Sequence, residues 1–477
     1  MRVSEHYNLN RTQPYLDFVD VRLDTDIEVF VDPTAIRMLP SVWGTECVSL
    51  LQHFFETVLK RIKAERHQEA IDLLSSLNER NEFHLGYSKK KSKGKALGRK
   101  SASKVWKALS KSQAAVSVLL EDLEDTCLLI HGIDRDILSD AVCNIIRGPL
   151  IKYTQEMCAY YGIPMVPDVD SGPIWSPLEE KWEHRLIPLP MPSASKLVLI
   201  PKIVVRHRLY YNAGEYYRHY LLPVMQEEEL RANSSLVQVL KDGRRRVTKK
   251  SLMEKYGADK LTIQKQTLKH PHVLKEYRKS KRRQPLPPLT HNDLAEIESV
   301  DIPNLGNLLE DIIRITPGTE GAPAYEDAIE RLLTALFYPS LSNPVKQHQI
   351  HDGRKRIDVT YVNIAKEGFF GWLSQHYPSA HIFVECKNYG KEVGNPEIDQ
   401  LAGRFSPSRG KVGILVCRNI DDKNLLMKRC RDTASDDRGF ILPLDDSDLD
   451  AIIKEQQASP DDQEFGYLKA IFNKLIM

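Results

Sequence analysis

Arg356-Ile357-Asp358-Val359-Thr360 and Ile382-Phe383-Val384-Glu385-Cys386-Lys387 are the two stretches that decide the fold of this chain. Both alternate β-forming with polar residues at a period of two, which is typical of strands. Alternation places Glu385 and Lys387 on one face of the second strand, and Asp358 projects from the first. Carboxylates at strand ends hold Mg²⁺, the metal activates a water molecule, and a lysine orients that water. The residue types therefore suit metal-assisted phosphodiester hydrolysis.

Helical and strand patterns alternate around these two stretches. Apolar periodicity predicts helices over 305–315, 324–337, 395–404, 422–433 and from about 446, and strands over 355–362, 381–387, 412–417 and 439–444. Such alternation predicts an α/β domain with a central mixed sheet flanked by helices. The long separation of Asp358 from Glu385 requires an insertion over 363–379, in which Phe369, Phe370 and Trp372 should pack.

The region before this domain has a different pattern. Residues 1–190 are predicted to form a mostly helical domain for sensing or assembly, with a strand at 26–33 and helices at 48–63, 67–79, 104–131 and 135–161. Residues 191–283 are predicted to be a basic α+β region, with a strand at 196–205, a tyrosine-rich helix at 210–220 and a short helix between Thr248 and Gly257. The Pro-rich segment 284–300 is expected to be a linker, and 301–477 to be the α/β domain.

Composition limits the class of protein. The chain has 477 residues, of which 42% are hydrophobic, enough for packed cores in several domains. No apolar run approaches the length of a membrane span, and the N-terminus does not resemble a signal peptide. Seven scattered cysteines without a CxxC motif indicate neither a zinc site nor a disulfide framework. We therefore expect a cytoplasmic protein that does not contact a membrane.

A net charge of +2 conceals two basic segments. Residues 241–283 contain sixteen Lys or Arg against four Asp or Glu, and residues 89–107 contain nine basic residues and no acidic one. Clustered positive charge suggests contact with a polyanion. In the first segment, contact with nucleic acid is predicted for Arg244, Arg245, Arg246, Lys281, Arg282 and Arg283. For 89–107 the alternatives are a solvated loop and a DNA clamp.

The order of the chemical residues resembles that of a known superfamily. A helix with Tyr325-Glu326, a strand with Asp358, a strand with Glu385-Cys386-Lys387 and a helix with Gln400 follow one another. This arrangement resembles the PD-(D/E)XK nucleases, and among them the Mrr-type restriction endonucleases, over roughly 320–420. The resemblance implies a restriction-endonuclease-like sheet in the C-terminal domain.

The resemblance also implies roles for these residues. Asp358 and Glu385 would ligate Mg²⁺, for which Mn²⁺ would substitute, with the carbonyl of Cys386 as a third ligand. Lys387 would position the attacking water, and Gln400 would support the site near the scissile phosphate. Glu326 would complete the metal shell directly or through water. Glu330 lies one turn away, so the identity of the helix glutamate stays open.

The resulting expectation is a bacterial Mg²⁺-dependent endonuclease that cleaves DNA in restriction or anti-phage defence. A nuclease of repair, recombination or transposition with the same fold is one alternative, and a non-catalytic nucleic-acid-binding subunit is another. RNA stays open as a substrate, because phosphodiester chemistry is common to both nucleic acids. Cleavage of both strands needs two sites, so a homodimer or a defence-system partner protein would suit the function. Arg404 and Arg409 either contact phosphate or are surface residues.

Overall fold

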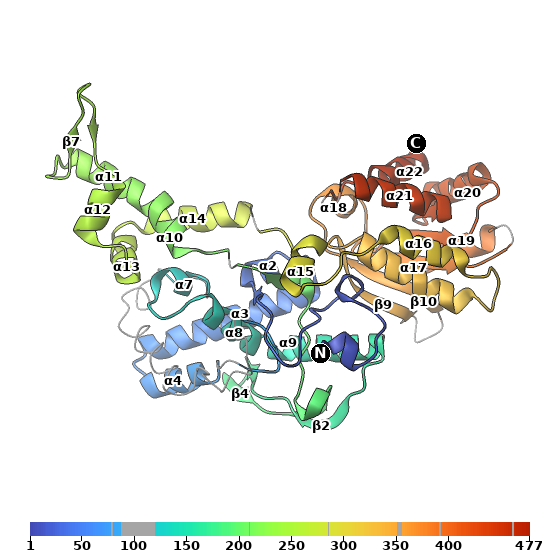
Figure 1. The fold of residues 1–477 in the computed structure, drawn as a ribbon, viewed down its shortest axis with the longest axis horizontal. Coiled ribbons are helices and arrows are strands. Elements are labelled where there is room, and N and C mark those ends of the chain that lie inside the picture. The colour runs from blue at the N-terminus through green and yellow to red at the C-terminus, as the bar shows by residue number, and fades with distance from the viewer. Residues whose placement is uncertain are drawn as a thin grey trace. The chain divides into compact units, whose positions relative to one another are not determined.

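The computed structural model describes residues 1–77, 80–86, 120–208, 210–284, 286–350, 355–390, 393–459 and 462–477. The chain divides into two compact units (Figure 1). Unit 1 comprises Met1–His6 and Val21–Pro288, and unit 2 comprises Tyr7–Asp20 and Leu289–Met477. The basic run 89–107 and the predicted helix 104–131, as far as residue 119, lie outside the described residues.

Unit 2 is built around a five-stranded mixed sheet in the order β13-β12-β11-β10-β9. Its strands are β9 (Leu341–Ile350), β10 (Lys355–Asn363), β11 (His381–Lys387), β12 (Val412–Cys417) and β13 (Phe440–Leu444). β9, β10 and β11 pair antiparallel, whereas β11, β12 and β13 pair in parallel. The predicted α/β class and mixed sheet are confirmed, and the edge strand β9 is an addition to the prediction.

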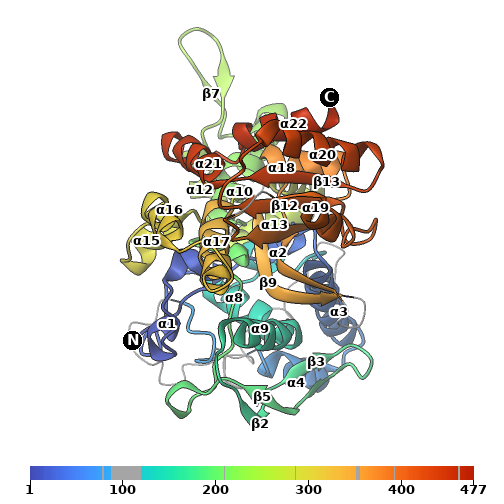
Figure 2. The ribbon, with the colours of Figure 1, turned by 90° about the vertical axis from the view of Figure 1, so that its right-hand side faces the viewer.

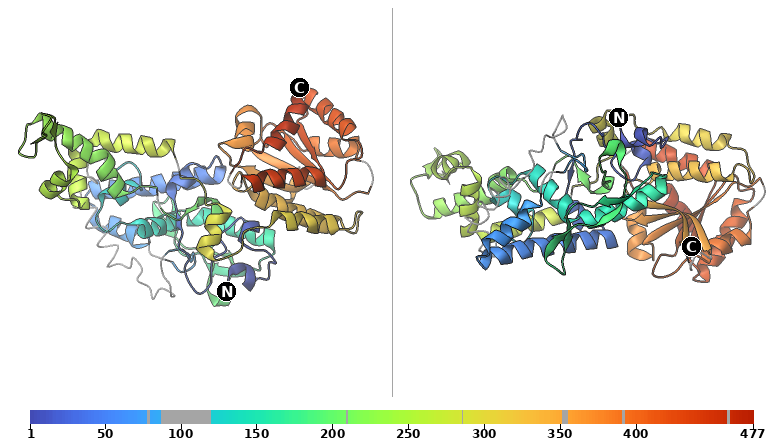
Figure 3. Two further views of the ribbon diagram at one scale, coloured as in Figure 1. Left: turned by 45° about the horizontal axis from the view of Figure 1, so that its top comes forward. Right: turned by 90° about the horizontal axis from the view of Figure 1, so that it is seen from below.

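Helices cover both faces of this sheet (Figures 2 and 3). The helices of unit 2 are α15 (His291–Glu298), α16 (Leu305–Arg314), α17 (Ala322–Leu336), α18 (Gly368–His376), α19 (Asn395–Ala402), α20 (Lys423–Ser435), α21 (Asp446–Ala458) and α22 (Gly466–Ile476). The segment expected to be a linker thus contains α15, and the predicted final helix is two helices. A capping box of Asp445 and Asp448 starts α21, because each carboxylate accepts a backbone N–H of the other residue.

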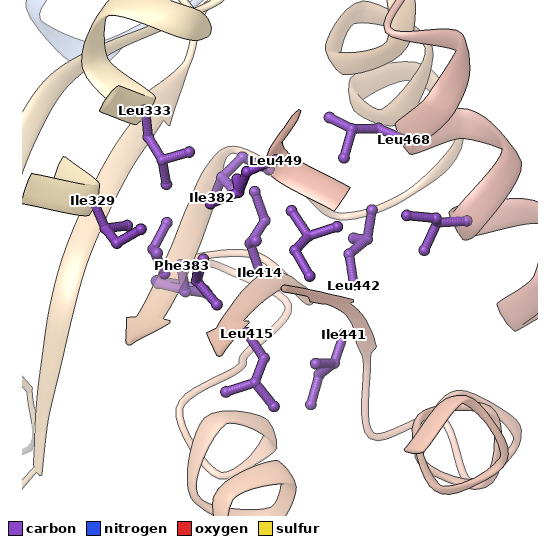
Figure 4. Packing of buried hydrophobic residues seen from close by; sticks show 14 of the residues in the cluster. Ile329, Leu333, Ile382, Phe383, Ile414, Leu415, Ile441, Leu442, Leu449 and Leu468 are labelled. Carbon is purple, nitrogen blue, oxygen red and sulfur yellow. The ribbon is translucent and has the colours of Figure 1, made fainter. Parts of the chain in front are cut away.

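The core of unit 2 lies on both faces of the sheet (Figure 4). Figure 4 shows Ile382, Ile414 and Leu442 pointing to the face that carries Leu449 and Leu468, and Leu415 and Ile441 pointing to the opposite face. All six residues of β12 are buried. A sheet covered on both faces requires apolar residues at successive positions. Charged residues within it, such as Glu385, therefore require a separate explanation.

Unit 1 is mostly helical. Its longer helices are α3 (Val42–Lys63), α4 (His67–Ser75), α8 (Arg135–Ile145), α9 (Arg147–Tyr161), α11 (Leu222–Arg231), α12 (Lys249–Tyr256), α13 (Lys260–Lys269) and α14 (Pro271–Arg283). The predicted limits of α12 are confirmed: the Thr248 hydroxyl caps its first turn, and Gly257 ends it with a positive φ of 93°. The predicted helix 135–161 is two helices that meet at Ile146. No helix among the described residues has both the length and the apolar character to cross a bilayer.

Two predicted strands of unit 1 are wrong over most of their length. The strand expected at 26–33 is reduced to β1 (Phe30–Val31), and the one at 196–205 to Val205 in β6 (Val205–Arg206). Leu197, Val198 and Leu199 are buried, but their N–H groups donate to Pro190 O, Glu82 O and the Thr154 hydroxyl. The apolar run is therefore a buried extended segment with scattered partners, not a member of a sheet.

Candidate active site

The sheet register brings the predicted strand residues together. Val359 of β10 lies opposite Val384 of β11 in an antiparallel pair, so Asp358 lies opposite Glu385. Alternation then places Asp358, Glu385 and Lys387 on one face of the sheet. Glu385 is 1% exposed and Lys387 is 9% exposed. The two residues are thus charged groups inside a largely apolar core.

A pocket of about 570 Å³ opens over these residues. Its wall includes all five residues predicted to be catalytic, Asp358, Glu385, Lys387, Glu326 and Gln400, together with Cys386, a predicted metal ligand. Ala322, Asn388, Tyr389, Asp399 and Arg404 complete it. Residues from α17, β10, β11 and α19 therefore meet in one place, although they span a long stretch of sequence.

Direct contacts connect the side chains of this pocket. Lys387 Nζ lies 2.8 Å from Glu385 Oε1 and donates to Gln400 Oε1 at 3.3 Å. The backbone N–H of Cys386 donates to Asp358 Oδ2 at 2.9 Å. The other oxygen of Glu385, Oε2, pairs with the guanidinium of Arg404, which is 5% exposed. Sequence reasoning left Arg404 undecided between a phosphate contact and a surface position, and no local pattern pointed to this pairing.

The charges of the pocket contribute to the pKa shifts of Asp358 and Lys387. Burial, together with the nearby carboxylates of Glu385 and Glu326, raises the pKa of Asp358 to about 6, although the Cys386 N–H opposes the shift. Burial acts against the charged form of Lys387, but attraction and hydrogen bonding from Glu385 outweigh it and raise the lysine pKa. Lys387 therefore stays a cation, whereas burial and the neighbouring carboxylates act against the charged form of Asp358 more strongly than Lys387 and the Cys386 N–H favour it.

The structure distinguishes the two candidate glutamates of α17. Glu326 lines the pocket and accepts a hydrogen bond from the side-chain amide of Gln347. Glu330 is fully buried, lies 2.6 Å from Arg11 Nη2 and accepts a hydrogen bond from Thr334 at 3.0 Å. Position therefore favours Glu326 as the helix carboxylate of the site.

The oxygen donors fit a hard divalent cation in kind, but they are not preassembled around one. No group of three or more His, Cys, Asp or Glu side chains within the described residues is close enough to hold a metal. Asp358, Glu385 and Glu326 nevertheless face one pocket, and carboxylates are the ligands that Mg²⁺ prefers. The raised pKa of Asp358 means that an added cation would relieve repulsion. Glu385 would have to exchange one of its present partners.

The basic residues predicted to bind nucleic acid fall into two different settings in unit 1. Arg244, Arg245 and Arg246 lie exposed on the hairpin of β7 (Gln238–Val239) and β8 (Arg245–Arg246), where Arg244 pairs with Asp242 at 2.6 Å.

The second cluster lies at the end of α14. Lys281 is buried and lies 2.7 Å from Glu215, and Arg282 lies 2.9 Å from Asp122, while Arg283 is exposed. Acidic residues of unit 1 thus neutralise part of this cluster.

Comparisons with known proteins assign no chemistry to the pocket. Residues 8–212 are similar to a family described as a domain of unknown function (DUF8370). No curated protein matches the chain, and no solved structure matches it. The matched segment includes most of the described helices before α10 (Ala213–Tyr216), but it ends well before β10 and β11, which carry the pocket.

Proposed function

We propose that unit 2 is a metal-dependent nuclease, of the restriction-endonuclease-like type, that hydrolyses phosphodiester bonds of DNA. The observation that carries the proposal is the meeting of Asp358, Glu385 and Lys387 on adjacent strands in one pocket. Burying a carboxylate and an ammonium costs free energy that well-packed apolar side chains would avoid. A sheet that needed only to be stable would have little reason to keep them there.

Each side chain has a role that its surroundings suit. Mg²⁺, when bound, would supply an activated water and compensate charge on the phosphate. Asp358 and Glu385, with the Cys386 carbonyl, would hold the ion. Lys387, kept charged by Glu385, would orient the nucleophilic water, and Gln400 restrains its ammonium through the 3.3 Å hydrogen bond. Glu326 supplies a further carboxylate at the wall of the same pocket.

A cleavage assay on plasmid DNA with Mg²⁺, Mn²⁺ or EDTA tests the proposal. Asp358→Ala, Glu385→Ala and Lys387→Ala should each lower the rate by about a hundredfold or more, because each removes a metal ligand or the water-orienting cation. Asp399→Asn is the matched control, because Asp399 lies at the pocket wall but is half-exposed and pairs with Arg438 at 2.8 Å. Metal-independent cleavage, or near wild-type cleavage by Asp358→Ala, would refute the assignment.

One observation favours a second candidate, a non-catalytic nucleic-acid-binding subunit. Both oxygens of Glu385 already have cationic partners, which is also how a purely structural carboxylate would be satisfied. Binding of DNA without cleavage under any divalent metal would support that candidate. Cleavage rates on intact, gapped and branched DNA duplexes would distinguish a restriction nuclease from a repair or recombination nuclease. A parallel assay with RNA would test RNA as the substrate. A role in anti-phage defence rests on the resemblance alone, and phage plating with wild type and Glu385→Ala tests it.

A further inference from the structure

Each carboxylate oxygen of Glu385 pairs with a cation of the pocket. Its Oε1 lies 2.8 Å from Lys387 Nζ, and its Oε2 pairs with Arg404. The side chains of both cations are largely shielded from water, at 10% exposure for Lys387 and 6% for Arg404. Shielding strengthens both ion pairs relative to exposed ones.

This pairing conflicts with metal binding at the same carboxylate. A divalent cation needs a carboxylate oxygen of Glu385, and it would bring further positive charge close to Arg404. Lys387 is also held by its hydrogen bond to Gln400, and the proposed reaction needs it next to the nucleophilic water. We therefore expect Lys387 to keep its position when the metal binds. Arg404 is therefore the partner that must leave.

A guanidinium that leaves Glu385 has a suitable destination in a nuclease pocket. Arginine offers several N–H donors in a planar fork, which matches the oxygens of a phosphate better than a lysine ammonium does. Arg404 lines the same pocket as Asp358 and Lys387, so a phosphate bound in this pocket would lie near the Arg404 side chain. The turn that carries Arg404 is tied down separately, because Arg409 Nη2 donates to the Arg404 carbonyl at 3.2 Å. The side chain can move while its backbone stays in place.

We propose that Arg404 is an exchangeable counter-cation that holds Glu385 in the metal-free pocket and moves to the substrate phosphate when a divalent metal takes its place. This inference rests on the proposed nuclease function, and it adds a coupling between metal and DNA. Metal alone must compete with Arg404 for Glu385, whereas DNA offers Arg404 a new partner. Each ligand therefore raises the affinity for the other by the same factor.

Binding of Mn²⁺, followed by the loss of its free-ion electron paramagnetic resonance signal, tests the coupling without any cleavage. In wild type, a duplex with non-cleavable phosphorothioate linkages should tighten Mn²⁺ binding about tenfold, the range expected for one charge-assisted hydrogen-bonded pair. Arg404→Gln should bind Mn²⁺ about tenfold more tightly than wild type without DNA, and DNA should add little further tightening. Its cleavage of normal DNA should fall in spite of the tighter metal binding.

Two further variants keep the test decisive. Arg404→Lys keeps a positive charge beside Glu385 but lacks the planar fork of the guanidinium. This variant should bind Mn²⁺ as weakly as wild type, and DNA should tighten its Mn²⁺ binding less than in wild type. Arg438→Gln is the matched control, because the partner of Arg438 is Asp399 of α19, whereas Glu385 pairs with Lys387 and Arg404. It should leave Mn²⁺ affinity and its dependence on DNA unchanged.

The outcomes separate this inference from the proposed function. Unchanged or weaker Mn²⁺ binding by a folded Arg404→Gln variant, checked by circular dichroism, would overturn the role of Arg404. If the wild-type protein binds Mn²⁺ but does not cleave DNA, the nuclease proposal is overturned. The Mn²⁺ affinity of Arg404→Gln would still show whether the metal replaces Arg404 at Glu385. Binding by Arg404→Gln when wild type binds no Mn²⁺ would support the exchange, because the arginine alone would then block the site. If neither protein binds Mn²⁺, both proposals fail.

Discussion

Substitution of Arg11 should destabilise unit 2, although Arg11 is more than three hundred residues from the sheet in sequence. The segment Tyr7–Asp20 belongs to unit 2, and there Arg11 Nη2 lies 2.6 Å from Glu330 Oε2. The Glu330 side chain is 0% exposed and that of Arg11 is 8% exposed. Asp17 Oδ1 adds hydrogen bonds from the backbone N–H of Asn343, at 2.8 Å, and from the Ser342 hydroxyl, at 3.0 Å.

The magnitude follows from what remains after the substitution. Arg11→Ala leaves a buried carboxylate with the Thr334 hydroxyl and with Lys346, whose Nζ is 3.8 Å away. Removal of one partner of a buried ion pair typically costs about 3–5 kcal/mol, and Lys346 should keep the loss near the lower end. A loss of about 3 kcal/mol is a large part of the stability of an ordinary domain. Arg11→Met with Glu330→Gln should recover much of it, because no charge stays buried.

Native-state hydrogen exchange resolves the effect within unit 2. Amides of α17 and β10 should exchange about a hundredfold faster in Arg11→Ala, the equivalent of about 3 kcal/mol. Arg22→Ala is the matched control, because Arg22 pairs with Asp24 at 3.0 Å with both side chains about half exposed. That variant should change stability by less than about 1 kcal/mol. If the amides of α17 in Arg11→Ala exchanged within twofold of the wild-type rate, this result would refute the reasoning. Deletion of Tyr7–Asp20 should lower the stability of unit 2 in the same way as Arg11→Ala.

Three further predictions concern the pocket and the basic hairpin. Because the folded state holds the proton of Asp358 more tightly than the unfolded state, with a pKa of about 6 against an ordinary 3.8, the metal-free protein should lose stability as pH rises from about 4 to 6. Asp358→Asn should therefore raise the free energy of unfolding at pH 7.5 by up to about 3 kcal/mol and change it little at pH 4, as urea titrations would show; no gain at pH 7.5 would contradict this. Glu326→Gln should lower the cleavage rate with little effect on stability, whereas Glu330→Gln should chiefly destabilise unit 2; the reverse result in paired rate and melting measurements would move the ligand to Glu330. Charge reversal at Arg244, Arg245 and Arg246 should weaken DNA binding for all sequences and reduce the log–log salt slope by about 2 to 3, measured by anisotropy, whereas an unchanged slope would mean that the hairpin does not contact phosphate.

Local sequence periodicity was enough to predict the α/β unit. The alternation in 382–387 and the apolar run 412–417 each correspond to a strand, because side chains of a strand alternate within two residues and buried parallel strands are apolar throughout. The edge strand β9 was missed, because its residues Ser342, Asn343 and Pro344 lack both signals. The strand predicted at 196–205 was wrong for the opposite reason. An apolar run indicates that a segment is buried, but it does not indicate which group accepts each backbone N–H.

The residue types of the site were visible in the sequence, but their partners were not. Asp358, Glu385 and Lys387 could be chosen because strand geometry fixes which face each side chain takes. The pairing of Arg404 with Glu385, and of Arg11 with Glu330 across 319 positions, depends on which elements pack together. Periodicity reports only what happens within a few residues, whereas ion pairs inside a core are selected by the whole packed chain. The sequence by itself thus determined the strands and the chemical groups that they present, and only the tertiary structure decided which charges those groups meet.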